Sequence, residues 1–148
     1  MKKLTAIIVS VLAFAAVASA QPRALGLRGG FGAEISYQHS VDSNFLEADL
    51  GWAPGEANLV AVYDFIFANS GNFNFYAGPG LRVGTFKTSS DVDGINLGVA
   101  GQIGVEFQIP SVPINLSLDW RPVVNFFGEG KQRGFCGYYG AFAIRYRF

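Results

Sequence analysis

Residues 95–109 read INLGVAGQIGVEFQI, and two kinds of residue alternate along the whole stretch. The odd-numbered positions are apolar apart from one glycine, while the even-numbered positions carry Gln102, Glu106 and other polar or small residues. Because successive side chains of a β-strand point to opposite faces, this pattern predicts a strand with one apolar and one polar face. The stretch is long for a strand of a soluble protein and is typical of a tilted strand that crosses a membrane.

The same alternation recurs in residues 114–121 and 141–148, and less regularly in residues 46–52, 59–67 and 73–84. Gly and aromatic residues are abundant, and no segment after the first twenty residues shows helical periodicity. The sequence therefore predicts an all-β fold, a closed antiparallel eight-stranded transmembrane β-barrel. We expect its strands at about 24–30, 33–39, 44–53, 57–68, 73–87, 94–109, 113–126 and 136–148.

Two places depart from a regular strand pattern. Residues 24–38 fit one long strand or two short strands that turn near residues 31–33. We favour two strands, because a single-chain bacterial barrel has an even number of strands. We also expect Pro79 to mark a bulge or a locally unpaired position, because proline cannot donate a hydrogen bond to the ladder.

The N-terminus has the three parts of a secretory signal: Lys2 and Lys3, an apolar run over residues 4–17, and the small residues Ala18-Ser19-Ala20. The expected organisation is a cleaved signal peptide over residues 1–20 and one β-barrel domain over residues 21–148. Cys136 is the single cysteine, so no internal disulfide is expected. Without Lys2 and Lys3 the chain has fewer basic than acidic side chains, which argues against nucleic acid as a partner.

The charged residues of the expected strands share one face, opposite the apolar side chains. If the apolar faces point outward, these residues line the lumen of the barrel and form a structural network of ion pairs. The expected network consists of Arg28, Glu34, Glu47, Asp49, Asp64, Arg82, Glu106, Asp119, Arg121, Arg145 and Arg147.

The alternation by itself also fits a soluble barrel whose apolar face points inward. The composition of the polar face favours the membrane alternative, because its basic residues are all arginines. Arginine binds carboxylates with a planar, two-pronged group, whereas a solvated surface ordinarily uses lysine as well. Aromatic residues near the expected strand ends, such as Trp52, Trp120 and Tyr63, are typical of the girdles that lie at the two membrane boundaries.

Four segments resemble the small eight-stranded outer-membrane barrel proteins, a group described as the outer membrane protein β-barrel domain family. The segments are residues 24–30 (ALGLRGG), 35–39 (ISYQH), 118–122 (LDWRP) and 143–148 (AIRYRF). The resemblance implies location in the bacterial outer membrane with both termini facing the periplasm. It also implies that Tyr146 and Phe148 belong to the signal that the barrel-insertion machinery reads, and that outer-membrane lipids surround the protein.

From this resemblance we expect an integral outer-membrane protein, monomeric, with a structural or surface-interaction role and a lumen plugged by ion pairs. Two alternatives stay open: a lipid-modifying hydrolase or acyl transferase, and a narrow pore. For the first, His39 and Ser40 are adjacent and so point to opposite faces of a strand, which does not suit joint catalysis. We therefore expect no enzyme activity and no catalytic, cofactor-binding or metal-binding residues.

Overall fold

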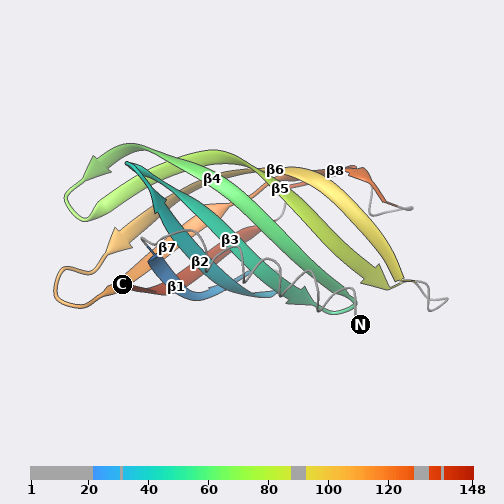
Figure 1. Ribbon diagram of the computed structural model, residues 1–148, viewed down its shortest axis with the longest axis horizontal. Coiled ribbons are helices and arrows are strands. Elements are labelled where there is room, and N and C mark those ends of the chain that lie inside the picture. Colours follow the sequence, from blue (N-terminus) through green and yellow to red (C-terminus); the bar gives the residue numbers. More distant parts are fainter. Residues whose placement is uncertain (1–21, 31, 88–92, 129–133, 138) are drawn as a thin grey trace.

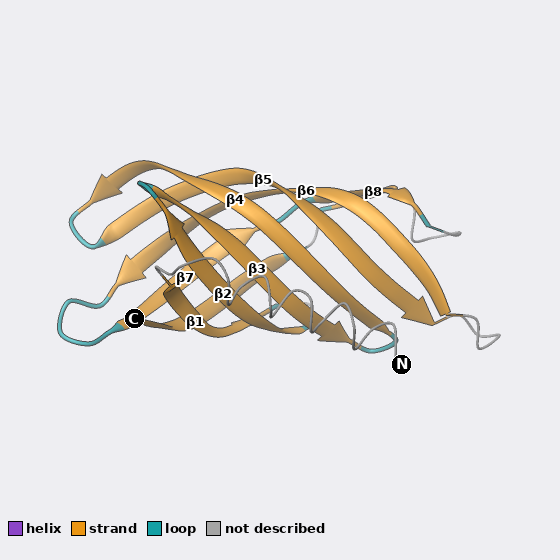
Figure 2. Ribbon diagram, in the orientation of Figure 1, coloured by secondary structure: helices purple, strands orange, loops and turns teal. Residues whose placement is uncertain are grey.

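A computed structural model of the protein describes residues 22–30, 32–87, 93–128, 134–137 and 139–148, which form one antiparallel sheet closed into a barrel (Figure 1). Within these residues the chain consists of strands and connecting loops (Figure 2). The all-β closed barrel predicted from the alternation is therefore confirmed. The expected signal peptide, residues 1–20, lies outside the described part of the chain.

The strands follow one another in the barrel wall almost in chain order. They are β1 (Pro22–Gly29), β2 (Ala33–Val41), β3 (Asn44–Ala53), β4 (Glu56–Ser70), β5 (Phe73–Lys87), β6 (Asp93–Gln108), β7 (Ile114–Trp120), β8 (Val123–Phe127), β9 (Gly134–Cys136) and β10 (Gly140–Arg147). The barrel closes where β1 pairs with β10, with Ala24 opposite Arg147 and Gly29 opposite Phe142.

Ten strand segments make eight strands of the wall, because two strands are interrupted. Both β7 and β8 pair with β6, and only Arg121 and Pro122 separate them. On the other side β7 pairs with β10 and β8 pairs with β9, so β9 and β10 are also two parts of one strand. The expected strands at 113–126 and 136–148 correspond to these two interrupted strands.

Residues 24–38 form two strands, as predicted, and the pairing of Gly29 with Ala33 closes a tight hairpin. Three prolines of the wall coincide with irregular pairing, and at the first of them, Pro22, the β1–β2 register shifts. The β4–β5 ladder stops after Val62 and resumes at Phe65, so Pro79 is locally unpaired toward β4, as expected. Pro122 separates β7 from β8, because it has no N–H, although its carbonyl still accepts a hydrogen bond of 2.9 Å from Gly101 N.

The two ends of the barrel differ in their connections. The turn end carries the tight turns at residues 42–43, 71–72 and 110–113 together with the C-terminus, which lies at the left in Figure 1. The opposite end, the loop end, carries the connections β1–β2, β3–β4, β5–β6 and β8–β9. At the turn end the last residue is tied to the first strand, because Phe148 N donates to Arg23 O at 3.2 Å.

The apolar faces of the strands point outward. Large apolar side chains from around the wall are exposed, for example Leu27 on β1, Leu81 on β5 and Ile144 on β10. The opposite faces fill the interior, where charged and amide side chains are buried beside a small apolar cluster of Val60, Val62, Ala100 and Val123. This arrangement is the reverse of a soluble barrel with an apolar core.

Candidate functional site

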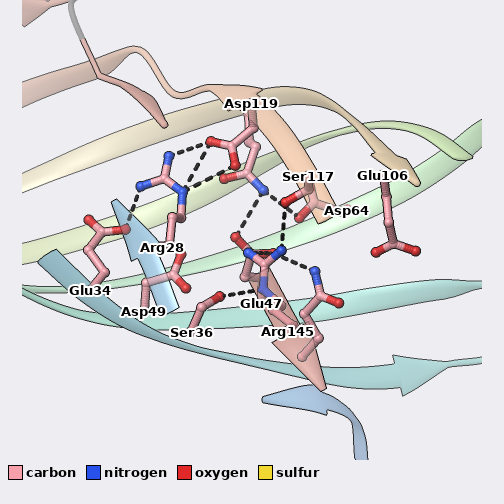
Figure 3. A network of polar contacts seen from close by, with 12 residues as sticks. Arg28, Glu34, Ser36, Glu47, Asp49, Asp64, Glu106, Ser117, Asp119 and Arg145 are labelled. Atoms are coloured by element: carbon pink, nitrogen blue, oxygen red, sulfur yellow. Dashed lines mark hydrogen bonds and ion pairs between the residues drawn. The ribbon is translucent and has the colours of Figure 1, made fainter. Parts of the chain in front are cut away.

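The interior of the barrel collects the charged residues that the alternation assigned to one face. Nine of the eleven are at most 4% exposed: Arg28, Glu47, Asp49, Asp64, Arg82, Glu106, Asp119, Arg121 and Arg145. Glu34 and Arg147 are half-buried. Figure 3 shows that side chains from strands far apart in the sequence meet in this space.

Toward the loop end, Arg28 on β1 joins two carboxylates. Its Nε donates to both carboxylate oxygens of Asp119 on β7, at 3.2 and 3.1 Å, and its two terminal nitrogens contact Asp119 and Glu34 (Figure 3). An arginine bound in this way has its charged donors directed to oxygens on both sides. Arg28 therefore ties β1 to its neighbour β2 and, past β10, to β7.

At the centre, Glu47 on β3 lies between two buried arginines. Its carboxylate oxygens are 2.9 Å from Arg121 Nη2 and 3.1 Å from Arg145 Nη2. Arg121 also contacts Asp49, and its Nε donates to Gln102 at 2.6 Å. Charges in this part of the lumen are shared, since Glu47 contacts two arginines and Arg121 lies near three carboxylates, those of Glu47, Asp49 and, at 3.6 Å, Glu34.

Uncharged side chains complete the central contacts. Arg145 donates to Ser36 at 2.9 Å and to Ser117 at 2.7 Å. Gln102 donates to Glu47 at 3.2 Å and to Asp64 at 3.0 Å. Asp64 thus joins the network through an amide, and within the described residues it has no ion pair with an arginine.

A separate group of polar residues lies near the turn end, around Glu106 on β6. Arg23 binds this carboxylate with two nitrogens, at 2.5 and 2.8 Å, and its guanidinium also lies 4.3 Å from the centre of the Phe45 ring. The amides of Asn74, Gln108 and Asn115 donate to the same carboxylate at 3.0 to 3.2 Å. Figure 3 shows Glu106 apart from the central contacts.

Arg23 is a member of the interior that the sequence pattern did not reveal. Ala24 and Arg28 point inward, so strict alternation would turn Arg23 outward. The β1–β2 register shifts between Pro22 and Ala24, and this irregularity allows Arg23 to reach Glu106.

A second missed residue is Glu56, which the sequence placed in a loop. The structure starts β4 at this residue, and Glu56 pairs with Arg82, which also donates to Asn96 at 3.0 Å and to Asn125 at 3.3 Å. Glu56 lies two positions before Asn58 and four before Val60, on the inward side of the alternation. Extending the predicted strand by one residue would have included it.

Arg147 occupies a different place from the other arginines. It donates to Gln108 at 3.1 Å and to the carbonyl oxygens of Ile109 and Val112 at 3.2 Å, and no carboxylate lies within ion-pair distance among the described residues. It therefore holds the β6–β7 turn and lies outside the interior ion pairs in which it was expected. Tyr146 and Phe148 are on the outer face with ring centres 5.5 Å apart, and their role in insertion stays a prediction.

His39 lies in the wall near the turn end. Its Nδ1 is 3.2 Å from the hydroxyl of Tyr37, two residues earlier on the same face of β2. In the described part of the chain, no three His, Cys, Asp or Glu side chains are arranged to hold a metal ion. In the same residues, no helix is long and apolar enough to span a membrane.

Comparison of the chain with protein-family models, with curated proteins and with solved structures found no match. The barrel and the distribution of polar and apolar residues over its two faces are therefore the features of this chain that bear on its function.

Proposed function

We propose that this protein is an integral protein of the bacterial outer membrane, with a structural or surface-interaction role and a lumen closed by ion pairs. The observation that carries the proposal is the opposite character of the two faces of the wall. Along β7, for example, Leu118 and Trp120 are exposed, whereas Ser117 and Asp119 between and beside them are buried.

The outer surface suits hydrocarbon better than water. The exposed side chains include Leu27 at 63%, Leu81 at 66% and Leu118 at 60%, which come from separate parts of the wall. Apolar surface is unfavourable in water, and patches of more than a few hundred Å² are uncommon on soluble monomers. In a bilayer, a closed barrel satisfies its backbone hydrogen bonds within the wall and presents such side chains to lipid.

Aromatic residues at the strand ends fit the same proposal. Trp52 and Trp120 are exposed on the outer face, and Trp120 Nε1 donates to Gly137 O at 2.6 Å. Tyr146 and Phe148 lie at the turn end, which would face the periplasm. Aromatic side chains with an apolar ring are favoured at the boundary between lipid and water. We expect outer-membrane lipids as neighbours, the insertion machinery as a transient partner and a monomeric state.

The filled interior favours a closed barrel over an open pore. Eight strands enclose a space that side chains can fill, and here arginines, carboxylates and amides cross it and bind one another. We expect no stable large conductance from the purified protein in a planar bilayer. A reproducible open state would favour the narrow-pore alternative instead.

Membrane fractionation combined with gel mobility tests the proposal. We expect the protein in the outer-membrane fraction, resistant to extraction with alkaline carbonate. The unheated protein should migrate differently from the boiled protein, because a closed barrel resists detergent until it is heated. Recovery of a folded chain in the soluble fraction without detergent would contradict the proposal.

A further inference from the structure

Asp64 on β4 is a buried carboxyl group without a basic partner among the described residues (Figure 3). Its Oδ2 accepts a hydrogen bond from Gln102 Nε2 at 3.0 Å, and its Oδ1 is buried with no hydrogen-bond partner in the same part of the chain. An ionised carboxylate has about four lone-pair sites to satisfy. One amide donor therefore compensates little of a negative charge on Asp64.

The side chains next to Asp64 are apolar or absent. Phe45 on β3 pairs with it across the ladder and is fully buried, and Val62 precedes it on the same inner face of β4. On the other side β5 contributes Gly78, where a Cβ would lie 2.9 Å from Asp64 Cα, so a glycine without a side chain is next to it. A charge in such surroundings is costly unless it is paired.

The amide that binds Asp64 is fixed in place and divided between two carboxyl groups. Gln102 Oε1 accepts from Arg121 Nε at 2.6 Å, which leaves Nε2 as the donor. This nitrogen donates to Asp64 at 3.0 Å and also to Glu47 at 3.2 Å. Glu47 is the carboxylate that binds two arginines and is therefore ionised. Two carboxyl groups that share a site disfavour ionisation of both at once.

The charges around Asp64 are mostly negative. The charged groups that interact with it electrostatically are Glu47 and Asp49 on β3, Asp119 on β7 and Arg121 between β7 and β8. On β5 the titratable group on this side is Tyr76, whose ring centre lies 5.2 Å from that of Phe45. Arg121 already lies near three other carboxylates, so it has little charge to offer Asp64.

We propose that the folded barrel holds a proton on Asp64 at neutral pH, so that the lumen contains a proton-binding site. The neutral carboxyl group keeps the hydrogen bond from Gln102 and avoids a buried charge that lacks an arginine in the described wall. The chain takes this proton from solvent when it folds and returns it when Asp64 ionises. The site goes beyond the proposed structural role, because it makes the closed barrel sensitive to pH.

The proton gives the stability of the barrel a defined dependence on pH. In the unfolded chain a solvated aspartate loses its proton near about pH 4. Between that pH and the pH at which Asp64 ionises in the barrel, the folded state holds one proton more than the unfolded state. The contribution of Asp64 to stability therefore falls as pH rises through this range.

Carboxyl-carbon NMR of the refolded barrel with isotope-labelled aspartate, in phosphocholine micelles, tests the proton directly. The signal that disappears in Asp64→Asn belongs to Asp64, and we expect it at the position of a carboxylic acid at neutral pH. In alkaline solution it should move to the position of a carboxylate. Asp42→Asn identifies an exposed reference at the turn end, where Asn tolerates the φ of 53°, and its signal should be that of an ionised group. A carboxylate signal for Asp64 at neutral pH would overturn the inference.

Urea unfolding in lipid vesicles gives a readout that a purely structural role would not move. The midpoint of the wild type should fall between about pH 6 and about pH 9. Asp64→Asn keeps an oxygen acceptor but cannot ionise, so its midpoint should fall clearly less. Glu106→Gln removes a buried carboxylate that is paired with Arg23, and it should lower the midpoint while keeping the pH dependence of the wild type. A fall in Asp64→Asn as steep as that of the wild type would contradict the assignment.

The infrared spectrum of the wild type makes the test independent of any variant that fails to fold. We expect the carbonyl band of a protonated carboxyl group at neutral pH and its loss in alkaline solution, before the barrel unfolds. Heat-modifiable mobility verifies that the barrel is closed in each sample. A closed barrel without this band at neutral pH would refute the proton site while leaving the proposed membrane role intact.

Discussion

Two groups of charged residues in the lumen compensate their buried charges in different ways. The central cluster, formed by Arg28, Glu34, Glu47, Asp49, Asp119, Arg121 and Arg145, shares its charges among several partners. The turn-end cluster has one ion pair, between Arg23 and Glu106, and surrounds that carboxylate with the amides of Asn74, Gln108 and Asn115. One cluster relies on shared charge, and the other on one pair supported by neutral donors.

The difference predicts how each cluster responds to loss of a member. A buried ion that loses its partner is strongly destabilising, whereas a carboxylate that keeps neutral donors is partly compensated. The central cluster should therefore be most sensitive at the residue that two arginines share, which is Glu47. The turn-end cluster should tolerate change better, because Arg23 is 13% exposed and keeps its contact with Phe45.

The largest effect is expected for Glu47→Gln. The substitution removes the carboxylate between Arg121 and Arg145 and leaves Arg145 without an ion pair among the described residues. We expect a loss of about 3–5 kcal/mol in the free energy of unfolding, the usual cost of breaking a buried ion pair. Urea titration of the barrel in lipid vesicles measures it, with Asp42→Asn as the exposed control. A loss no larger than that of Glu106→Gln would contradict the comparison.

The second-largest loss in the free energy of unfolding is expected for a charge placed on the outer face of the wall. Leu81 is exposed on β5 and pairs with Ala61 and Val99, so an arginine there points away from both clusters. In a bilayer, Leu81→Arg should lower the free energy of unfolding by about 2–4 kcal/mol if the residue lies near the midplane. The same vesicle assay, with Leu81→Ala as the control for size, measures the loss. An unchanged stability would mean that hydrocarbon does not cover this face.

The sequence predicted the central cluster and Glu106, but it missed Arg23, the partner of Glu106 in the turn-end cluster. Period-two alternation was enough to place Glu47, Asp49 and Asp119 on one face, because their strands β3 and β7 are regular before the prolines and turns begin. It did not find Arg23, since a register shift reverses the side to which that residue points. Alternation predicts faces only as far as the register continues, so bulges and strand ends must come from the structure.

The sequence also could not predict which charged residues of the interior bind each other. Arg28 binds Asp119 across 91 positions of the chain, and Arg121 binds Glu47 across 74. Such pairs depend on which strands come close to each other in the closed barrel, a property that no local pattern contains. For individual residues, the pattern missed Arg23 and Glu56 in the interior, and it placed Arg147 among the ion pairs although this residue lies at the turn.

A smaller effect is expected at the turn-end cluster. Glu106→Gln removes the charge that pairs with Arg23 but keeps an amide oxygen as acceptor. We expect a loss of about 1.5–3 kcal/mol, the range for a hydrogen bond to a charged group. In the double variant Arg23→Met with Glu106→Gln, the loss should be smaller than the sum of the single losses, because both charges are gone. Additive losses in vesicle unfolding would show that the pair is not coupled.

The smallest effect is expected from removing apolar volume on the outer face. Leu118 lies between the buried Ser117 and Asp119 of β7, so its neighbours in sequence belong to the interior while its own side chain is 60% exposed. Lipid chains can fill the space left by Leu118→Ala, so no cavity forms and the loss should stay within about 1.5 kcal/mol, the transfer free energy of the removed apolar groups. If Leu118→Ala instead matched Glu47→Gln in the same assay, the apolar side chains would form the core, and the inner and outer faces would have to be exchanged.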